Sequence, residues 1–219
     1  MPKFITEPGF VEYKDHMGTD MSVVDAARVS FHKESTNYDD VSNEKLIHFL
    51  AKEHHELPFA HTSIQLRIKS SISIARQFGK HQVGFSWNEV SRRYVTDEPE
   101  FYIPAEWRGK PINKKQGSSK YEDENSIDWL THNYKSAIKA AYDTYLDMIK
   151  LNVAPELARL VLPQSMMTEW IWTGSLLGYA RVYKLRTGPD SQYESQYIAH
   201  KIGEVCEKLF PISWKVLTS

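Results

Sequence analysis

The sequence holds a single cysteine, Cys206, among its 219 residues. One thiol can form neither an internal disulfide nor a multi-cysteine metal site. Its place beside Val205, on the apolar face of a predicted helix, is typical of a core residue rather than a nucleophile. Basic charge is not in excess either, because 27 lysines and arginines stand against 28 acidic residues. Broad nucleic-acid binding requires such an excess, so no nucleic-acid partner is expected.

Long apolar runs are missing as well. No stretch approaches the about 18 residues that a membrane span needs, and the opening residues Met1–Phe4 form no signal peptide. Internal repeats and low-complexity tracts are absent, while the hydrophobic content of 41% is ordinary for a globular protein. The sequence therefore predicts one domain over residues 1–219, without a membrane partner. A cytoplasmic location is expected, in the host cytoplasm if the protein is viral.

Apolar spacing predicts several helices. One covers Met21–Val29, and a second begins at Ser42, a favourable N-cap, and ends near His54 because of Pro58. The clearest helix begins after Ser126 and has apolar residues at steps of three and four. These are Ile127, Leu130, Tyr134, Ile138, Ala141, Tyr145 and Met148. A further helix is predicted from Pro155 to Leu162, and a short one follows residue 173 and ends at Leu185. The last predicted helix has Asp190 as its cap and carries Ile198, Ile202, Val205 and Leu209.

Strand signals are fewer. Between Thr62 and Lys69 the apolar residues alternate with polar ones, which indicates a strand with one buried face. Residues 166–173 are aromatic and favour a strand, whereas residues 74–78 fit a short helix. Residues 104–125 carry Gly, Pro, Lys, Ser and acidic residues with almost no apolar anchor, so a long surface loop is expected. About half helix with a few strands predicts an α/β or α+β fold.

Candidate chemistry concentrates in residues 76–93. Four cations, Arg76, Lys80, Arg92 and Arg93, face a single acid, Glu89, within an otherwise neutral chain. Local positive charge, forked guanidinium donors and nearby glycines are what phosphate binding requires. The segment can equally be a solvated polar loop. Its two glycines have the wrong spacing for a Walker or dinucleotide motif.

Two other arginine positions attract attention. Arg186, near Arg181 and Asp190, precedes a helix whose N-terminus favours anions, but it can also simply complement the C-terminal dipole of the preceding helix. Arg159 lies in the apolar run 157–162, where a buried guanidinium needs a phosphate or carboxylate partner. A snorkelling arginine at a helix edge is the alternative for Arg159.

Metal and nucleophile motifs are weak. His54, His55 and His61 lack the i, i+4 histidine pair of zinc proteases, and Pro58 interrupts any shared face, so no metal site is predicted. Ser91 lies among arginines without the G-x-S-x-G elbow of serine hydrolases. Ser91 is therefore interpreted as a binding residue.

The segment 76–94 resembles the signature of flavin-dependent thymidylate synthases, which reads RQW, then RHR, then NE-x-S-x-RY. The corresponding residues here are Arg76-Gln-Phe, Lys80-His81-Gln82 and Asn88 to Tyr94. Other segments resemble the family in the same order along most of the chain. They are Gly9–Glu12, Ala26–Phe31, His55–His61, Glu100–Pro104, Ala158–Pro163, Leu185–Arg186 and Gln192–Glu194. Each is weak alone, and their shared order is strong.

The sequence departs from the family pattern around the flavin. Lys80-His81-Gln82 replaces the RHR triplet, and the stretch from Gln82 to Asn88 is one residue longer than usual. Asp190 stands where the family has a histidine, and Ser175 and Arg181 stand where it has asparagines. The nucleotide-binding residues match the family more closely.

The resemblance implies a homotetramer with active sites at subunit junctions, each subunit combining a small, mostly antiparallel sheet with long helices. It implies FAD as cofactor, NADPH as reductant and 5,10-methylenetetrahydrofolate as carbon donor in the conversion of dUMP to dTMP. No enzyme cysteine adds to the uracil ring in this family, which agrees with a buried Cys206.

The resemblance also implies site residues. The catalytic residue is Arg186, which would stabilise the charge that develops when the uracil N3–H ionises. The dUMP ligands are Gln77, Phe78, Gly79, Lys80, Glu89, Val90, Ser91, Arg92, Arg93, Arg159 and Arg186. The FAD ligands are Ser30, His55, Leu57, Lys80, His81, Gln82, Val83, Asn88, Glu89, Ser175, Leu177 and Arg181, some of them from neighbouring subunits.

Two alternatives stay open. A related flavin- and folate-dependent enzyme would methylate another pyrimidine nucleotide on the same fold. A non-enzymatic module would bind nucleotides or RNA through residues 76–93, with Trp87 and Tyr94 stacking on bases. The neutral net charge argues against this second alternative.

Overall fold

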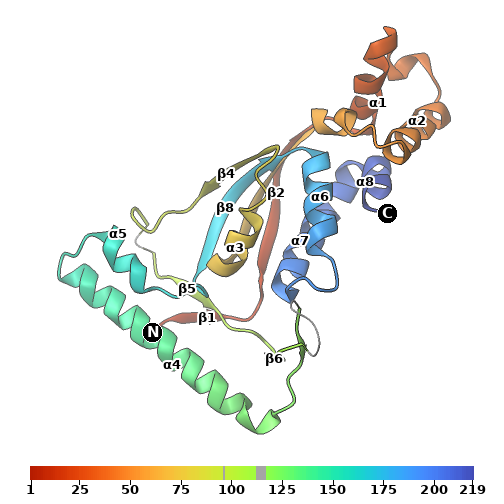
Figure 1. Cartoon of the computed structure of the whole chain (residues 1–219). Helices are drawn as coiled ribbons and strands as arrows, with labels where there is room; N and C mark the ends of the chain where they lie inside the picture. Colours follow the sequence, from red (N-terminus) through yellow and green to blue (C-terminus); the bar gives the residue numbers. More distant parts are fainter. Residues whose placement is uncertain (96, 112–116) are drawn as a thin grey trace.

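The computed structural model describes residues 1–95, 97–111 and 117–219 (Figure 1). A four-stranded antiparallel sheet lies at its centre, in the order β2-β3-β8-β4. These strands are Gly9–Met17 (β2), Ser63–Ser71 (β3), Phe85–Glu89 (β4) and Met167–Gly174 (β8). The strands predicted at 62–69 and 166–173 are confirmed as the two central ones. The predicted α+β class, with a mostly antiparallel sheet, is confirmed with them.

The alternation in β3 explains how the sheet buries one face. Ile64, Leu66 and Ile68 are each 0% exposed. Leu66 is paired with Trp172 and Ile68 with Trp170 on β8, so the two strands place their largest apolar side chains together. Burying such side chains stabilises the fold by about 1.5–3 kcal/mol each.

Two smaller pairs of strands flank the sheet. Lys3–Ile5 (β1) runs parallel to Glu100–Tyr102 (β5), and Arg108–Gly109 (β6) is antiparallel to Ser119–Lys120 (β7). The described part of the predicted surface loop over 104–125 is mostly irregular and has no buried residue, but the loop also contains this short pair of strands. Trp107 holds this segment in place, because its ring packs edge-on against Tyr134 with centroids 5.3 Å apart and its indole donates to the Thr131 hydroxyl over 2.9 Å.

The helices bring the remaining chain around this sheet. They are Asp20–Arg28 (α1), Asp40–Lys52 (α2), Ile72–Phe78 (α3), Ile127–Lys150 (α4), Pro155–Ala158 (α5), Leu176–Arg186 (α6), Tyr193–Leu209 (α7) and Pro211–Thr218 (α8). Short 3₁₀ helices cover Val29–Phe31, Ser35–Asn37, Leu57–His61, Glu124–Ser126 and Arg159–Val161. In the described residues, no helix combines the length and apolarity that crossing a bilayer requires.

Two predicted helix starts and one predicted cap differ from the structure. Asp39, rather than Ser42, caps α2, because its Oδ1 accepts a hydrogen bond of 2.7 Å from the Ser42 backbone N–H. Helix α7 begins after Gln192 and not at Asp190. Ser126 does precede α4, but it makes no capping bond, because its hydroxyl donates to Asp123 instead.

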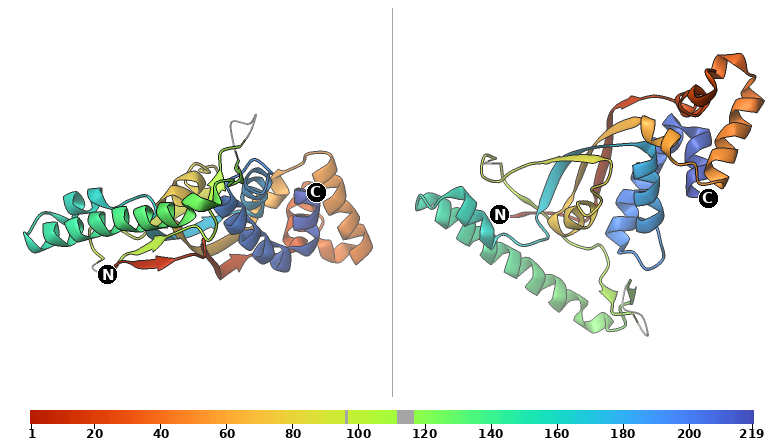
Figure 2. Two further views of the ribbon diagram at one scale, coloured as in Figure 1. Left: turned by 90° about the horizontal axis from the view of Figure 1, so that it is seen from below. Right: turned by 45° about the horizontal axis from the view of Figure 1, so that its top comes forward.

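Some of the helices lie at opposite ends of the molecule, and α3, α6 and α7 lie against the sheet between them (Figure 1). Helix α4 crosses one end, whereas α1, α2 and α8 gather at the other (Figure 2). Helix α8, which the sequence patterns did not predict, is fixed there by Asp20, whose carboxylate accepts hydrogen bonds of 3.0 and 2.9 Å from the backbone N–H groups of Ile212 and Ser213.

The core divides into two apolar clusters. The larger one joins the sheet to α3, α6, α7 and α8, and it contains Cys206, which is fully buried as predicted. The smaller one packs Ile138 and Tyr142 of α4 against Phe101 and Met166. The predicted stripe of α4 is buried only around this cluster, and Ile127 at its start is 36% exposed. The part of α4 beyond the cluster therefore presents apolar side chains to its surroundings.

Candidate active site

Three adjoining hollows surround the short helix α3. Ser73 and Gln77 lie one helical turn apart and line the first, which we name the Gln77 hollow. Ile72 and Arg76 line the second, the Arg159 hollow. Arg76 also borders the third, the Trp87 hollow. Their volumes are about 1160, 690 and 840 Å³. Helix α3 thus presents Ser73 and Gln77 to the first hollow and Arg76 to the other two.

The Gln77 hollow contains Arg186, the predicted catalytic residue. The last turn of α6 brings this side chain beside α3. Its Nη2 donates to the Gln77 backbone carbonyl over 2.8 Å, and its Nε donates to Nε2 of His81 over 3.0 Å. Burial lowers the pKa of the Arg186 guanidinium, which still remains charged at neutral pH. Two fixed hydrogen bonds hold the guanidinium in one orientation, and Nη1 has no acceptor among the described residues.

His81 can accept that hydrogen bond only when neutral. Burial first, and then the adjacent Arg186 charge, lower the pKa of the His81 imidazole from its ordinary value of 6.5. The ring is therefore mainly neutral at physiological pH, with Nε2 free of a proton. His81 was predicted as a flavin ligand, and the structure places it where the Gln77 and Trp87 hollows meet.

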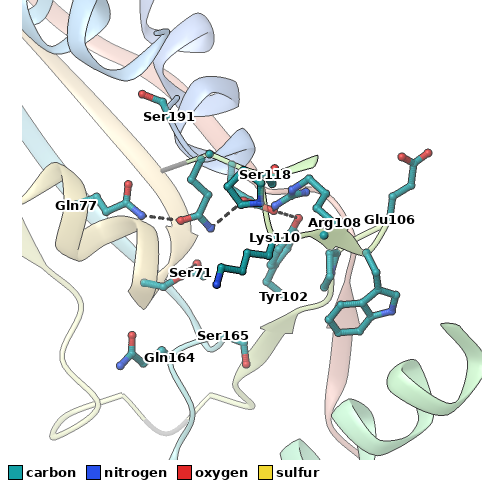
Figure 3. Close-up of a pocket in the computed structure, with 18 of the residues that line it drawn as sticks. Ser71, Gln77, Tyr102, Glu106, Arg108, Lys110, Ser118, Gln164, Ser165 and Ser191 are labelled. Atoms are coloured by element: carbon teal, nitrogen blue, oxygen red, sulfur yellow. Dashed lines mark hydrogen bonds and ion pairs between the residues drawn. The ribbon is translucent and has the colours of Figure 1, made fainter. Parts of the chain in front are cut away.

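Polar side chains from three other parts of the chain complete the Gln77 hollow (Figure 3). Gln192 and Glu194 come from the start of α7, Tyr102 from the end of β5, and Arg108 from β6. Lys110 extends into the same hollow (Figure 3). The hollow thus combines amides and cations with the Glu194 carboxylate, which Arg108 neutralises, and the remaining donors suit an acceptor-rich anionic ligand.

The Arg159 hollow holds a second group of predicted nucleotide ligands: Glu89, Val90, Arg92 and Arg159. The Glu89 carboxylate is held at the end of β4, where Oε1 accepts a hydrogen bond of 2.8 Å from the Thr168 hydroxyl. Its Oε2 accepts another of 3.2 Å from the Trp87 indole. Arg92 donates to the backbone carbonyl of Asp97. Acid and guanidinium groups thus border one opening.

The Trp87 hollow has an aromatic side and a polar side. Phe85, Trp87 and Trp172 form an aromatic wall, in which Phe85 stacks on Trp172 with ring centroids 4.3 Å apart. Lys80, His81 and Gln82 contribute the polar side. Its 840 Å³ lies within the about 300–1,000 Å³ typical of ligand and cofactor pockets.

The structure does not gather all the predicted residues in one hollow of one chain. Gln77 and Arg186 line one hollow, and Glu89, Val90, Arg92 and Arg159 line another. Ser91 and Arg93 lie beside each other, with Arg93 Nε 3.4 Å from Ser91 Oγ, but line none of the three. The Phe78 ring is buried in the core, so only its backbone is available to a ligand.

The other predicted flavin ligands lie around the first turns of α6. Arg181 forms an ion pair of 2.5 Å with Glu56, which places His55 and Leu57 next to this helix. Ser175 caps α6, and Leu177 is buried below it. Ser30, in the 3₁₀ helix after α1, and the exposed Val83 and Asn88 line none of the three hollows.

Sequence reasoning missed Glu194 as a site residue, although a signal for it is present. Glu194, Ile198, Ile202 and Cys206 are spaced by four, so the acid occupies the apolar stripe of α7. A carboxylate on a buried stripe requires several hydrogen-bond donors, and the structure supplies them. Nothing in the sequence indicated that Arg108 and Tyr102 would be the hydrogen-bond donors to this acid.

The fold is a small antiparallel sheet, and the helix beside it separates hollows lined by amides and cations. This arrangement is typical of an enzyme that acts on an anionic small molecule. The particular family follows from comparison: residues 13–212 match the family model of the thymidylate synthase complementing protein, and the chain belongs to this family of flavin-dependent thymidylate synthases. The resemblance inferred from the sequence is thereby confirmed.

Relatives and solved structures agree. The chain is 34% identical over 207 residues to a flavin-dependent thymidylate synthase of Thermosipho africanus, covering 94% of this chain and 90% of that protein. It is 32% identical over 211 residues to the enzyme of the same name from Thermotoga neapolitana, covering 96% and 91%. The structure of a UMP/dUMP methylase, PolB of Streptomyces cacaoi, superposes with a TM-score of 0.88 at 26% identity, covering 99% of this chain and 96% of that one.

The family uses FAD, and the residues of the Trp87 hollow fit this cofactor. Its aromatic wall matches the flat apolar ring system of a flavin, and Lys80 with Arg76 provides charge for a diphosphate. NADPH and methylenetetrahydrofolate are the usual co-substrates of the family. The altered Lys80-His81-Gln82 triplet keeps a cation, a ring and an amide in this hollow.

Proposed function

We propose that this protein converts dUMP to dTMP by reductive methylation, with 5,10-methylenetetrahydrofolate as carbon donor and NADPH as reductant of FAD. The family and its relatives support this reaction, and the solved relative is named as a methylase of UMP and dUMP. The observation that carries the proposal is Arg186, held by two hydrogen bonds beside Gln77 in a hollow of suitable chemistry.

Arg186 would activate the uracil ring. Its Nε and one Nη2 hydrogen are occupied by His81 and the Gln77 carbonyl. Nη1, which has no acceptor in the part of the chain that the structure describes, would face the edge of the ring. Charge develops on this edge when N3–H ionises, and a preorganised cation there commonly contributes about 3 kcal/mol. Because the guanidinium is already fixed, little reorganisation is needed when the charge appears.

Bound FAD supplies hydride and mediates transfer of the carbon unit. No enzyme thiol is required, which agrees with the state of Cys206 in the core. Burial raises the pKa of this thiol well above its ordinary range, so the nucleophilic thiolate is not formed. The chain's own contribution is then to bind the nucleotide, to orient the uracil and to stabilise charge.

We also propose that the active site forms between copies of this chain in a homotetramer. The division of the predicted nucleotide ligands between the Gln77 and Arg159 hollows supports this arrangement. Several large apolar side chains at or next to predicted ligand positions are exposed: Leu57 (76%) and Val83 (81%), both predicted flavin ligands, and Leu160 (73%), which follows Arg159. Such exposure is typical of surfaces that become buried in an assembly.

A mixing experiment tests the shared site. Arg186→Ala and Arg159→Ala each remove one ligand, from different hollows. If each site takes Arg186 from one chain and Arg159 from another, random mixing of the two inactive variants restores about one quarter of the sites. Light scattering of the same samples gives the oligomeric state. No recovery after verified subunit exchange would place both arginines in a site made by one chain.

The nucleotide itself is the second question. The solved relative is named for UMP as well as dUMP, so methylation of another pyrimidine nucleotide is the alternative function. The holoenzyme would be offered dUMP, UMP and dCMP separately with the folate and NADPH, and the products identified by mass spectrometry. We expect a methyl addition on dUMP. Methylation of UMP at an equal or higher kcat/KM would favour the alternative.

A further inference from the structure

A buried carboxylate lies beneath the Gln77 hollow. Glu194 is 2% exposed and comes from the first turn of α7. Its Oε1 accepts hydrogen bonds from the Tyr102 hydroxyl over 2.8 Å and from Arg108 Nη2 over 2.5 Å. Its Oε2 accepts one of 2.9 Å from Nε2 of Gln192. Strand β5, strand β6 and the start of α7 thus meet at one acid.

This carboxylate is ionised and can only accept hydrogen bonds. Burial acts to raise the pKa of Glu194, but the hydrogen bonds from Arg108, Tyr102 and Gln192 outweigh burial and hold that pKa below its ordinary value. An ionised carboxylate has no proton to donate. Whatever amide faces it must therefore present its NH₂ group.

That requirement fixes two amides in succession. Gln192 turns its NH₂ to Glu194, so its Oε1 accepts a hydrogen bond of 2.7 Å from Nε2 of Gln77. The Oε1 of Gln77 in turn accepts a bond of 2.8 Å from the Ser195 hydroxyl. A dashed line in Figure 3 marks the hydrogen bond that Gln77 donates. Within the described residues, the second N–H of Gln77 has no acceptor and lies in the hollow.

An amide without such a neighbour can turn over and exchange its donor for its acceptor. Here the orientation follows from a charge, because the reverse orientation would place Gln192 Oε1 against a carboxylate. We propose that Glu194 is a positioning residue which, through Gln192, holds Gln77 as a hydrogen-bond donor to an acceptor oxygen of the bound pyrimidine nucleotide. This inference rests on the proposed function, which places the nucleotide at Gln77.

Glu194→Gln tests the inference at constant shape. A neutral amide at 194 can donate as well as accept, so Gln192 and Gln77 lose their enforced orientation. For the FAD-loaded enzyme, titrated with dUMP in a calorimeter without folate, we expect about tenfold weaker binding, as loss of one hydrogen bond to a ligand predicts. We expect the KM for dUMP to rise similarly while kcat changes by less than about twofold. Glu204→Gln, on the exposed side of α7, is the matched control and should bind dUMP normally.

The double variant distinguishes a positioning role from a general structural one. Gln77→Ala should weaken dUMP binding, and adding Glu194→Gln should then have no further effect. The inference would be overturned if the double variant bound dUMP more weakly by the product of the two single effects, or if Glu194→Gln had the wild-type dissociation constant. Gln77 would then remain a ligand without help from Glu194. If Gln77→Ala and Arg186→Ala both bind dUMP like wild type, the proposed placement of the nucleotide fails instead.

A second variant covers the case in which Glu194→Gln does not fold. Gln192→Leu removes the connection but leaves Glu194 with Arg108 and Tyr102. It should show the same rise in the dissociation constant, with thermal unfolding and flavin absorption like wild type. Unchanged dUMP binding in this variant would also overturn the inference.

Discussion

The Arg186 guanidinium and the His81 imidazole form a hydrogen bond of 3.0 Å between residues 105 positions apart. The bond joins a predicted catalytic residue to a predicted flavin ligand, and it exists only while His81 is neutral. Because burial and the nearby charge both disfavour protonation of His81, proton binding to this ring opposes the folded arrangement.

The free energy of unfolding should therefore fall as the pH is lowered and His81 becomes protonated in the unfolded chain. The pKa of His81 is lower in the folded protein than the ordinary 6.5, so the unfolded chain takes up a proton first as the pH falls. Stability is therefore lost below about pH 6.5 and is unaffected by this group above it. Urea unfolding of wild type and His81→Asn at pH 7 and pH 5.5 measures the effect. The variant should lose less stability between the two pH values, and equal losses would contradict the prediction.

Arg186→Ala should preserve the fold and the bound flavin but remove most turnover. Loss of a preorganised charge at the reacting ring predicts a decrease in kcat of about a hundredfold. Lys184→Ala, an exposed cation on the same helix, is the control and should be near wild type. The measurement is the rate of dTMP formation in single turnovers, with the flavin content read from the absorption spectrum. Near-wild-type methylation by Arg186→Ala would remove the role assigned to it.

Ser91→Ala should weaken nucleotide binding and leave measurable catalysis. The Ser91 hydroxyl accepts weak contacts of 3.4 Å from both the backbone N–H and Nε of Arg93, so it helps to place a predicted phosphate ligand. Losing one such contact predicts a rise in KM of about five- to tenfold with kcat largely kept. Steady-state kinetics with dUMP as the varied substrate measure it, with Ser86→Ala on β4 as control. A complete loss of chemistry with normal binding would instead indicate a nucleophilic serine.

Cys206→Ala should leave the reaction intact and lower stability. The sulfur is buried among apolar side chains, so its removal leaves a small cavity that costs about 1 kcal/mol. Turnover should stay within about twofold of wild type, since no step uses the thiol. Denaturant unfolding and the rate of dTMP formation measure the two effects. An inactive but folded Cys206→Ala would require a cysteine in the mechanism.

Local sequence patterns predicted the helices and strands in which buried apolar residues recur at a regular spacing along the chain. Strand β3 was recognisable because Ile64, Leu66 and Ile68 all point to the core, and α4 because its apolar residues recur at helical steps. Strand β2 was missed, since most of its residues are exposed and show no clear alternation. The start of α2 was misplaced because Asp39 and Ser42 are both good caps, and only the structure shows which one accepts the bond.

The candidate site was predictable from the sequence only through family resemblance. Gln77 and Arg186 were both named, but their contact depends on how α3 and α6 pack, which no short window of sequence contains. The same holds for Arg108, whose carboxylate partner, Glu194, is 86 residues away. A loop composition that resembles solvent-exposed chain therefore concealed an arginine that reaches the core.

The order of strands in the sheet has a consequence for synthesis of the chain. Strand β8 lies between β3 and β4, yet its residues 167–174 emerge from the ribosome well after both neighbours. Until then β3 can pair only with β2, and its edge toward β8 stays open. Contacts this distant in sequence slow folding and leave an unpaired strand edge exposed while the chain is incomplete. A nascent chain that stops before residue 167 thus carries an apolar strand with no partner on one side, a state suited to chaperone binding and open to aggregation.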